Sequence, residues 1–183
     1  MELQRAEAIS RQFEAVDHQL LKINLFGGSA LTGDMKVPKQ RNESEIASSI
    51  PVTYVPARNT LFLSYCLVFA EVKGIGDVFL GVNAVDYSGY PDCRPEFFDK
   101  MGESLGYGSK LWTEYHVPLQ IEIPIIEMSK ADIVKLGVEL KAPLELTWSC
   151  YQGGEEPCRR CDSCILRANG FRDAGYPDPA LHA

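Results

Sequence analysis

The sequence has no apolar run of the roughly 20 residues that a membrane-spanning helix needs. Its longest mostly apolar run is LFLSYCLVFA at 61–70. The first residues, MELQRAEAISR, also lack the apolar core of a secretory signal peptide. We therefore expect a cytoplasmic protein with no membrane partner, in a compartment where thiols stay reduced.

Positive charge and histidine are also scarce. The chain has 18 basic and 25 acidic side chains, and its formal net charge of −7 repels a phosphate backbone. Direct binding of nucleic acid is therefore not expected. The three histidines are scattered, so their spacing indicates neither a catalytic triad nor a histidine metal site.

The hydrophobic pattern predicts alternating helices and strands. The segment 2–16 reads as an amphipathic helix with one buried face, made of Leu3, Ala6, Ile9, Phe13 and Val16. Strands are predicted at 18–26, 51–55, 77–82 and 119–125, a long surface loop at 27–45, and helices at 61–73, 95–105, 129–141 and 161–175. Strands joined by helical crossovers are parallel, so the fold class is α/β with a parallel sheet.

Local signals also mark where these helices begin and end. Asn59 or Thr60 can cap the helix 61–73, and Gly74 can end it. Ser129 and Asp132 have the spacing of a capping box at the start of the helix 129–141.

Polar residues follow three of the predicted strands. In an open parallel sheet, ligands bind outside the carboxyl ends of the strands. We expect a substrate site there that contains Arg58, Asn59, Asp86, Tyr87, Tyr90, Asp92 and Arg94. Guanidinium groups bind phosphates or carboxylates, whereas carboxylates and aromatic rings suit a flat heterocycle. The alternative is that these loops are merely solvated and that Asp and Asn serve as turn residues.

Lys130 follows the last of these strands and falls in the first turn of the helix 129–141. A cation at this position opposes the helix macrodipole unless an anion is bound there too. We therefore expect Lys130 to bind a nucleotide phosphate. The alternative is an ordinary exposed lysine at a helix start.

Four of the six cysteines are clustered in the pattern C-x7-C-x2-C-x2-C, at Cys150, Cys158, Cys161 and Cys164. In a reducing compartment such a cluster reads as a metal site, and four thiolates with no open position are typical of structural zinc. An iron–sulfur cluster or unrelated thiols are the alternatives. We expect a nucleotide- and substrate-binding α/β core over 1–148, followed by a zinc lobe and last helix over 149–183.

Four long motifs resemble one known family. They read VPARNTLFLS, GVNAVDYSGYPDCRPEF, SKADIVKLG and LTWSCYQGGEEPCRRCDSCILRANGF. In this order they closely resemble the 7-cyano-7-deazaguanine synthase family, also called preQ0 synthase or QueC. The resemblance runs from the first predicted helix to the last.

The resemblance implies an adenine nucleotide alpha hydrolase-like, Rossmann-like fold with a structural Zn2+. It also implies an ATP-dependent ligase that converts 7-carboxy-7-deazaguanine and ammonia to the nitrile preQ0 for queuosine biosynthesis, with ATP and Mg2+ as co-substrate and a homodimer as the assembly. By motif, the four cysteines would hold zinc. Asp86, Tyr87, Tyr90, Asp92 and Arg94 would lie near the deazaguanine, and Arg58, Asn59 and Lys130 near phosphates or the substrate carboxylate.

One family motif is absent from this sequence. Family members open with a strand and an SGGxDS phosphate loop, and the 183 residues contain no such motif. We therefore expect a chain shortened at its N-terminus relative to the family, with two readings. Either it acts as an enzyme whose phosphate cradle comes from elsewhere, or it is an inactive zinc-bearing scaffold that binds a partner.

Overall fold

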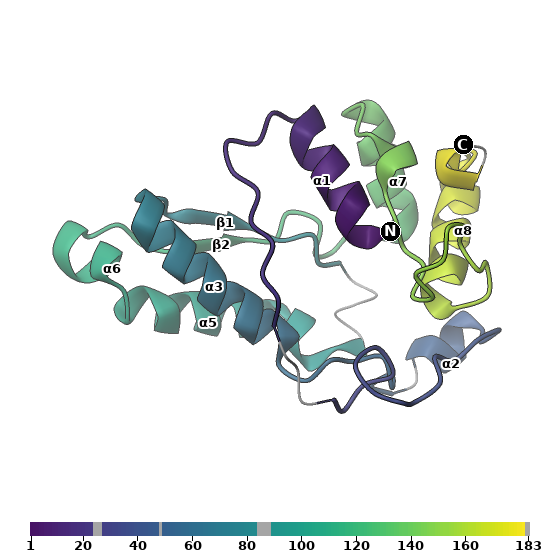
Figure 1. Cartoon of the computed structure of the whole chain (residues 1–183), viewed down its shortest axis with the longest axis horizontal. Helices are drawn as coiled ribbons and strands as arrows, with labels where there is room; N and C mark the ends of the chain where they lie inside the picture. The colour runs from purple at the N-terminus through teal and green to yellow at the C-terminus, as the bar shows by residue number, and fades with distance from the viewer. Residues whose placement is uncertain (24–26, 48, 84–88, 182–183) are drawn as a thin grey trace. The chain divides into compact units, whose positions relative to one another are not determined.

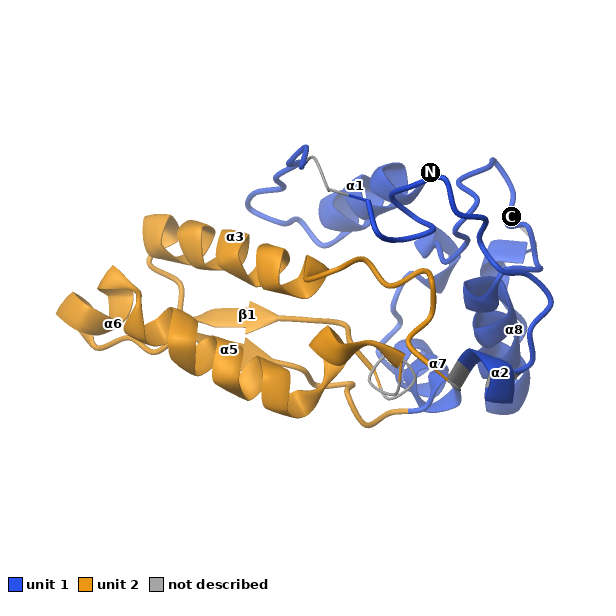
Figure 2. Cartoon of the chain, turned by 90° about the horizontal axis from the view of Figure 1, so that it is seen from below, with its two compact units in different colours: residues 1–46, 129–183 blue, residues 47–128 orange. Residues whose placement is uncertain are grey.

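The computed structural model describes residues 1–23, 27–47, 49–83 and 89–181 (Figure 1). The chain divides into two compact units, one of residues 1–46 and 129–183 and the other of residues 47–128 (Figure 2). The predicted boundary between residues 148 and 149 falls inside the first of these units. That functional division therefore stays a prediction.

The unit of residues 47–128 is an α/β arrangement with parallel strands. Strand β1 (Asp77–Phe79) pairs in parallel with β2 (Gln120–Glu122), and Val78 lies opposite Ile121. Its helices are α3 (Arg58–Lys73), η1 (Pro91–Cys93), α5 (Pro95–Tyr107) and α6 (Lys110–Tyr115). Helices α5 and α6 form the crossover from β1 to β2, so the predicted α/β class with parallel strands is confirmed.

The core of this unit is apolar. Leu63 of α3 and Phe98 of α5 are fully buried and pack in one cluster with Val82 and Cys93, and Val78 and Ile121 of the strands pack against it. A second cluster joins Ala70, Leu111 and Leu119. Burial of this surface on both helices is the main force that holds them to the strands.

The other unit is built from helices and loops. Its elements are α1 (Glu2–Gln12), α2 (Glu43–Ala47), α7 (Lys130–Glu139), η2 (Leu144–Leu146), α8 (Asp162–Ala174) and η3 (Pro179–Leu181). Helices α7 and α8 lie side by side (Figure 1). The predicted capping box is confirmed, because Ser129 accepts a hydrogen bond from the Asp132 N–H and the Asp132 carboxylate accepts one from the Ser129 N–H.

Two predicted strands were wrong over the residues that the structure describes. Residues 51–55 form a turn, in which the Tyr54 N–H donates to the Pro51 carbonyl at 2.8 Å. Residues 18–23 have no regular structure, and 24–26 lie outside the described residues. β-Branched residues favour a strand only where a neighbouring strand supplies hydrogen bonds, and here none does within the described chain.

The helices agree better with the prediction, although two of its details were wrong. Helix α3 begins at Arg58 after Ala57, which has φ 54°, so neither Asn59 nor Thr60 is its N-cap. Gly74 ends α3 with φ 69°, as predicted. In α1 no side chain is buried, and Leu3 is 65% exposed, so the predicted buried face of this helix was wrong.

The sequence patterns missed α2 and α6, both of which are short. Helix α6 has Ser109 as its N-cap, and the Ser109 hydroxyl accepts a hydrogen bond from the Trp112 N–H at 3.1 Å. A serine before a helix is a common N-cap, so this signal could have been recognised in the sequence. Among the described residues, no helix has both the length and the apolar character needed to cross a membrane.

Replacing Gly170 with Ala should separate α7 from α8. A Cβ at Gly170 would lie 2.7 Å from Lys130 Cβ and 3.2 Å from its carbonyl carbon, neither of which is the free end of a side chain. Overpacking outweighs the better helix propensity of Ala, so we expect a loss of about 1 to 2 kcal/mol in the free energy of unfolding. Urea denaturation measures this loss.

The matched control for this substitution is Gly106→Ala in α5. There the nearest atom to the new Cβ would be the Leu119 backbone N at 4.0 Å, an ordinary contact. The control should be neutral or slightly stabilising. Equal effects of the two substitutions would contradict a close approach at Gly170.

Candidate functional site

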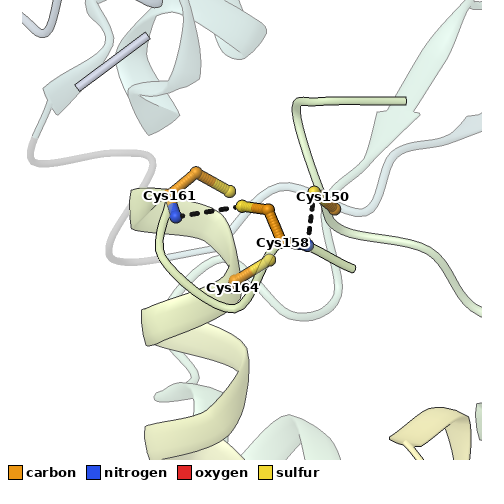
Figure 3. Close-up of side chains that lie close together, drawn as sticks. All are labelled: Cys150, Cys158, Cys161 and Cys164. Atoms are coloured by element: carbon orange, nitrogen blue, oxygen red, sulfur yellow. Dashed lines mark hydrogen bonds between the residues drawn. The ribbon is translucent and has the colours of Figure 1, made fainter. Parts of the chain in front are cut away.

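The four clustered cysteines converge in the structure as their spacing predicted. All four Sγ atoms lie within 4.8 Å of one another, and Cys150, Cys161 and Cys164 are buried while Cys158 is half-buried (Figure 3). In a tetrahedral zinc site with Zn–S bonds of about 2.3 Å, sulfur atoms are about 3.8 Å apart. The cluster therefore fits a zinc ion after a small contraction, and the donor set leaves no position open.

Backbone N–H groups hold the sulfur atoms in place. The Cys158 N–H donates to Cys150 Sγ at 3.2 Å, and the Cys161 N–H donates to Cys158 Sγ at 3.3 Å (Figure 3). The Gln152 N–H also donates to Cys150 Sγ, at 3.4 Å. Donors aimed at sulfur stabilise thiolates, which are the form that binds a metal.

The thiols differ in their affinity for a proton. Burial alone would raise the pKa of Cys158, but the backbone N–H groups of Arg160 and Cys161 and the neighbouring thiols outweigh it and lower that pKa to about 6. Burial raises the pKa of Cys161. Burial, and then the Cys161 thiol, raise that of Cys164. One thiolate therefore forms readily near neutral pH, whereas Cys161 and Cys164 would need a bound cation to ionise.

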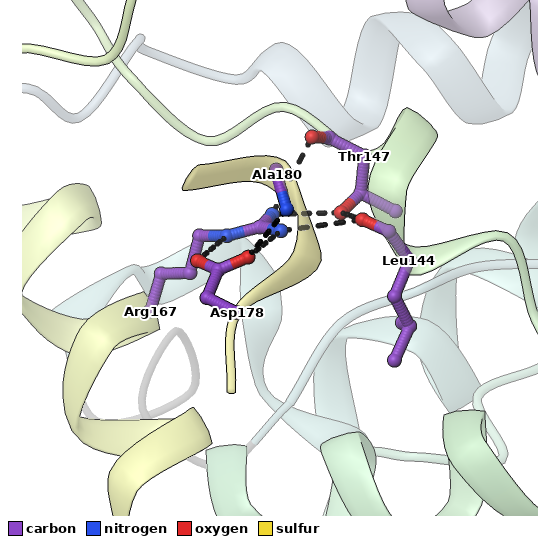
Figure 4. A network of polar contacts seen from close by, with 5 residues as sticks. All are labelled: Leu144, Thr147, Arg167, Asp178 and Ala180. Carbon is purple, nitrogen blue, oxygen red and sulfur yellow. Dashed lines mark hydrogen bonds and ion pairs between the residues drawn. The ribbon is translucent and has the colours of Figure 1, made fainter. Parts of the chain in front are cut away.

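Sequence reasoning missed a polar clamp that anchors the chain next to the cysteines. The Arg167 guanidinium of α8 donates to both carboxylate oxygens of Asp178, at 2.6 and 2.8 Å (Figure 4). It also donates to Thr147 Oγ1 at 2.7 Å and to the Leu144 carbonyl at 3.3 Å. Both charged side chains are largely buried. The clamp thus joins α8, η2 and the segment before η3.

A small apolar pocket lies between this clamp and the cysteine cluster. Its volume is about 110 Å³, and Trp148, Cys150, Pro157 and Cys164 contribute to its lining. Pockets that bind substrates or drugs measure roughly 300 to 1,000 Å³. This pocket is therefore too small for a nucleotide.

In the unit of residues 47–128, the structure brings Asn59 and Asp92 together. The Asn59 N–H donates to Asp92 Oδ2 at 3.0 Å, and Asn59 Nδ2 donates to the Asp92 carbonyl at 2.8 Å and to Cys93 Sγ at 3.2 Å. All three residues are buried. Asp92 thereby supplies the capping carboxylate that Ala57 cannot provide at the start of α3.

Tyr90 lies next to this pair. Its hydroxyl is 3.1 Å from Thr53 Oγ1, and its ring lies 5.9 Å from the ring of Tyr54. The half-buried Tyr54 in turn accepts a hydrogen bond from the Ala57 N–H. Two aromatic rings are therefore grouped beside the N-terminal end of α3.

The remaining predicted site residues fall in three places. Arg58 begins α3, with its guanidinium 5.8 Å from the ring centroid of Phe62, and the exposed Arg94 precedes α5. Asp86 and Tyr87 lie outside the described residues. Lys130 is the first residue of α7 and belongs to the other unit. Its contact with a nucleotide and the contacts of the others with substrate stay predictions.

These observations define a class of protein: an α/β protein with parallel strands that carries a candidate four-thiolate metal site. Residues 1–175 match the sequence family described as queuosine biosynthesis protein QueC. The chain therefore belongs to the QueC family, whose fold is the Rossmann-like adenine nucleotide alpha hydrolase type.

Curated relatives of this chain bear the name 7-cyano-7-deazaguanine synthase, and three of them illustrate the similarity. The chain is 53% identical to the one from Thermoplasma volcanium, over its whole length and 75% of that relative. It is 48% identical to the one from Syntrophus aciditrophicus, over 99% of the chain and 80% of the relative. Identity to the one from Nostoc punctiforme is 46%, over the whole chain and 82% of the relative.

Removing one cysteine should abolish stable metal binding. The protein purified with zinc should contain about one zinc ion per chain, and Cys158→Ala should lose most of it, because three thiolates no longer complete the tetrahedron. Metal content measured by mass spectrometry tests this. Cys66→Ala is the control, since this half-buried thiol lies in α3, and it should keep its zinc. Full zinc in Cys158→Ala would refute the four-thiolate site.

Replacing Asn59 with Ala should destabilise the protein by about 1 to 3 kcal/mol, because the buried Asp92 carbonyl and Cys93 thiol lose their donor. Urea unfolding measures the change. Ser64→Ala in the same helix removes only a bond to the Thr60 carbonyl and should cost little. A variant with unchanged stability but weakened substrate binding would instead make Asn59 a direct substrate contact.

Proposed function

We propose that this chain is a 7-cyano-7-deazaguanine synthase, an ATP-dependent ligase that converts 7-carboxy-7-deazaguanine and ammonia to preQ0. The observation that carries the proposal is the 46 to 53% identity to relatives of that name, which extends over the whole chain. The convergent cysteines support it as well, since the resemblance implied a structural zinc.

The chemistry of the reaction explains why such a site needs cations. A carboxylate is a poor electrophile, so ATP first converts it to an acyl adenylate and releases pyrophosphate. Ammonia then attacks the acyl carbon and displaces AMP, which leaves an amide. ATP then activates the amide oxygen by adenylylation and releases pyrophosphate. Departure of AMP, which carries that oxygen away, and loss of two protons give the nitrile. Negative charge develops on phosphates at each activation, and nearby cations stabilise it.

Residues of the unit 47–128 suit the substrate in this proposal. Arg58 and Arg94 would bind the anionic groups, and Tyr90 would lie against the flat deazaguanine ring. Asn59 and Asp92 would act mainly by holding the loop 90–94 against the start of α3, since their polar groups already bond to each other. Lys130, at the start of α7, would bind a phosphate.

Zinc would serve structure rather than the reaction. Bound by Cys150, Cys158, Cys161 and Cys164, it would cross-link the loop 150–161 to the first turn of α8 and neutralise the thiolates. The four ligands leave no position for substrate. Mg2+ would accompany ATP as part of the co-substrate.

We also propose that the chain forms a homodimer. Helix α3 exposes a row of large apolar side chains at three- and four-residue spacing, namely Phe62, Tyr65, Val68, Phe69 and Val72. Exposed apolar surface of this kind is a feature of protein interfaces. Sedimentation equilibrium of the chain, with Val68→Glu as a variant that should dissociate it, tests the assembly.

Single-turnover formation of preQ0 tests the activity. Zinc-loaded protein mixed with 7-carboxy-7-deazaguanine, ATP, Mg2+ and ammonia should yield the nitrile and AMP, detected by mass spectrometry. Arg58→Ala should slow product formation by about 10- to 1,000-fold if its cation meets developing charge. Lys100→Ala is a matched control, since Lys100 pairs with Glu103 on the exposed side of α5.

Two results would count against the proposal. Binding of 7-carboxy-7-deazaguanine without any product would favour the other reading, a zinc-bearing scaffold that keeps the substrate site and binds a partner. Neither binding nor turnover in a folded, zinc-loaded protein would refute the substrate assignment altogether.

A further inference from the structure

Residues 37–41, which we name the strap, run along the cysteine loop. Lys39 forms an antiparallel bridge with Cys161, and the Gln40 N–H donates to the Arg160 carbonyl at 2.9 Å. Val37 packs against the cluster of buried cysteines. This segment fell within the loop 27–45, which the sequence pattern described only as polar surface. In the structure it covers sulfur-bearing residues that lie more than 100 positions away.

The strap ends in a partly buried ion pair with α8. The Arg41 guanidinium donates through Nε to Asp162 Oδ1 at 3.2 Å and through Nη2 to Asp162 Oδ2. The Asp162 side chain is 6% exposed and that of Arg41 is 24% exposed. Two parallel bonds to a carboxylate fix both its position and its orientation. Arg41 also donates to the Glu45 carbonyl, which ties the pair to α2.

Asp162 lies at the point where the cysteine loop becomes a helix. It follows Cys161 directly, begins α8 and precedes Cys164 by two residues. A carboxylate in the first turn of a helix is stabilised by the macrodipole, but a buried carboxylate also needs a partner. Any movement of Asp162 would carry both neighbouring cysteines with it.

We propose that the strap closes the candidate metal site, and that Arg41 is a positioning residue that holds Cys161 and Cys164 in place through Asp162. Arg41 acts in this role through Asp162. Its effect is to slow the opening through which zinc leaves and through which thiol reagents enter. The proposal depends on the metal-binding part of the proposed function and not on nitrile synthesis.

The rate of zinc release tests the strap without any substrate. Zinc-loaded protein is mixed with an excess of the chromogenic chelator 4-(2-pyridylazo)resorcinol, and the absorbance of the zinc complex is followed. Arg41→Ala should release zinc about 10- to 100-fold faster than the unaltered protein, the range typical for loss of a partner that orients a metal ligand. Reaction of the cysteines with a disulfide reagent should accelerate in parallel.

Two further variants separate positioning from general damage. Asp162→Asn should have a similar effect, and the double variant Arg41→Ala with Asp162→Asn should release zinc no faster than the worse of the two, because the residues act as one pair. Arg172→Ala is the control on the same helix. Its guanidinium pairs with Asp173 and Asn169 at the surface, so its zinc release should be unchanged.

A conservative variant keeps the test decisive if Arg41→Ala fails to fold. Arg41→Lys retains the charge but cannot form the two-bond contact, so it should release zinc faster than the unaltered protein and more slowly than the alanine variant. Val37→Ala, which trims the packing and keeps the ion pair, should also accelerate release. If the Arg41→Lys and Val37→Ala variants both fold and release zinc at the original rate, the proposal that the strap closes the metal site is overturned.

The outcomes also distinguish failure of the strap from failure of the metal site. If the protein retains no zinc whether or not Cys158 is present, the metal site itself is refuted, and the proposal about the strap is refuted as well. If zinc binds through the four cysteines but leaves Arg41→Ala and Arg172→Ala at the same rate, only the strap is refuted.

Discussion

Four thiols within 4.8 Å of one another set the central constraint on the unit of residues 1–46 and 129–183. Burial favours protonated thiols at Cys161 and Cys164, whereas N–H donors favour a thiolate at Cys158. A divalent cation would resolve this conflict, because it would replace the protons and bond to every sulfur. Three parts of the surrounding chain converge on this cluster. Helix α8 begins at the cluster, the Arg167 clamp anchors the segment that leads into it, and residues 37–41 lie along it.

The unit of residues 47–128 depends on a different interaction, the hydrogen bonds between Asn59 and Asp92. Asn59 and Asp92 bond to each other in a buried position and satisfy the start of α3. The same contact fixes the turn of η1. The positions of Tyr90 and Arg94, on either side of η1, are therefore determined by a buried contact rather than by loop conformation alone. Polar residues that looked interchangeable in the sequence therefore have two different roles. Asn59 and Asp92 hold the start of α3 to η1, whereas Tyr90 and Arg94 flank this contact.

Sequence patterns located the long elements well. Helix α7 was readable from its Ser129 and Asp132 capping box, and the end of α3 from Gly74, because both signals act within a few residues of themselves. The segment 51–55 was misread because its β-branched residues lie between Pro51 and Pro56, which favour a turn, and because strand formation needs a partner. The apolar face of α1 was readable as a pattern, but whether it is covered depends on what packs there.

The sequence by itself determined the family, the parallel α/β class and the four metal-ligand candidates, because long motifs and short cysteine spacings are local properties of the chain. Only the tertiary structure decided which polar residues work together. Arg41 reaches Asp162 across 121 positions, and Asn59 meets Asp92 across 33. Such pairs follow no periodicity, and their partners are chosen by how helices and loops pack. The sequence does not distinguish a solvated lysine, arginine or aspartate in a loop from a buried one. Only burial against a specific partner gives such a residue a structural role.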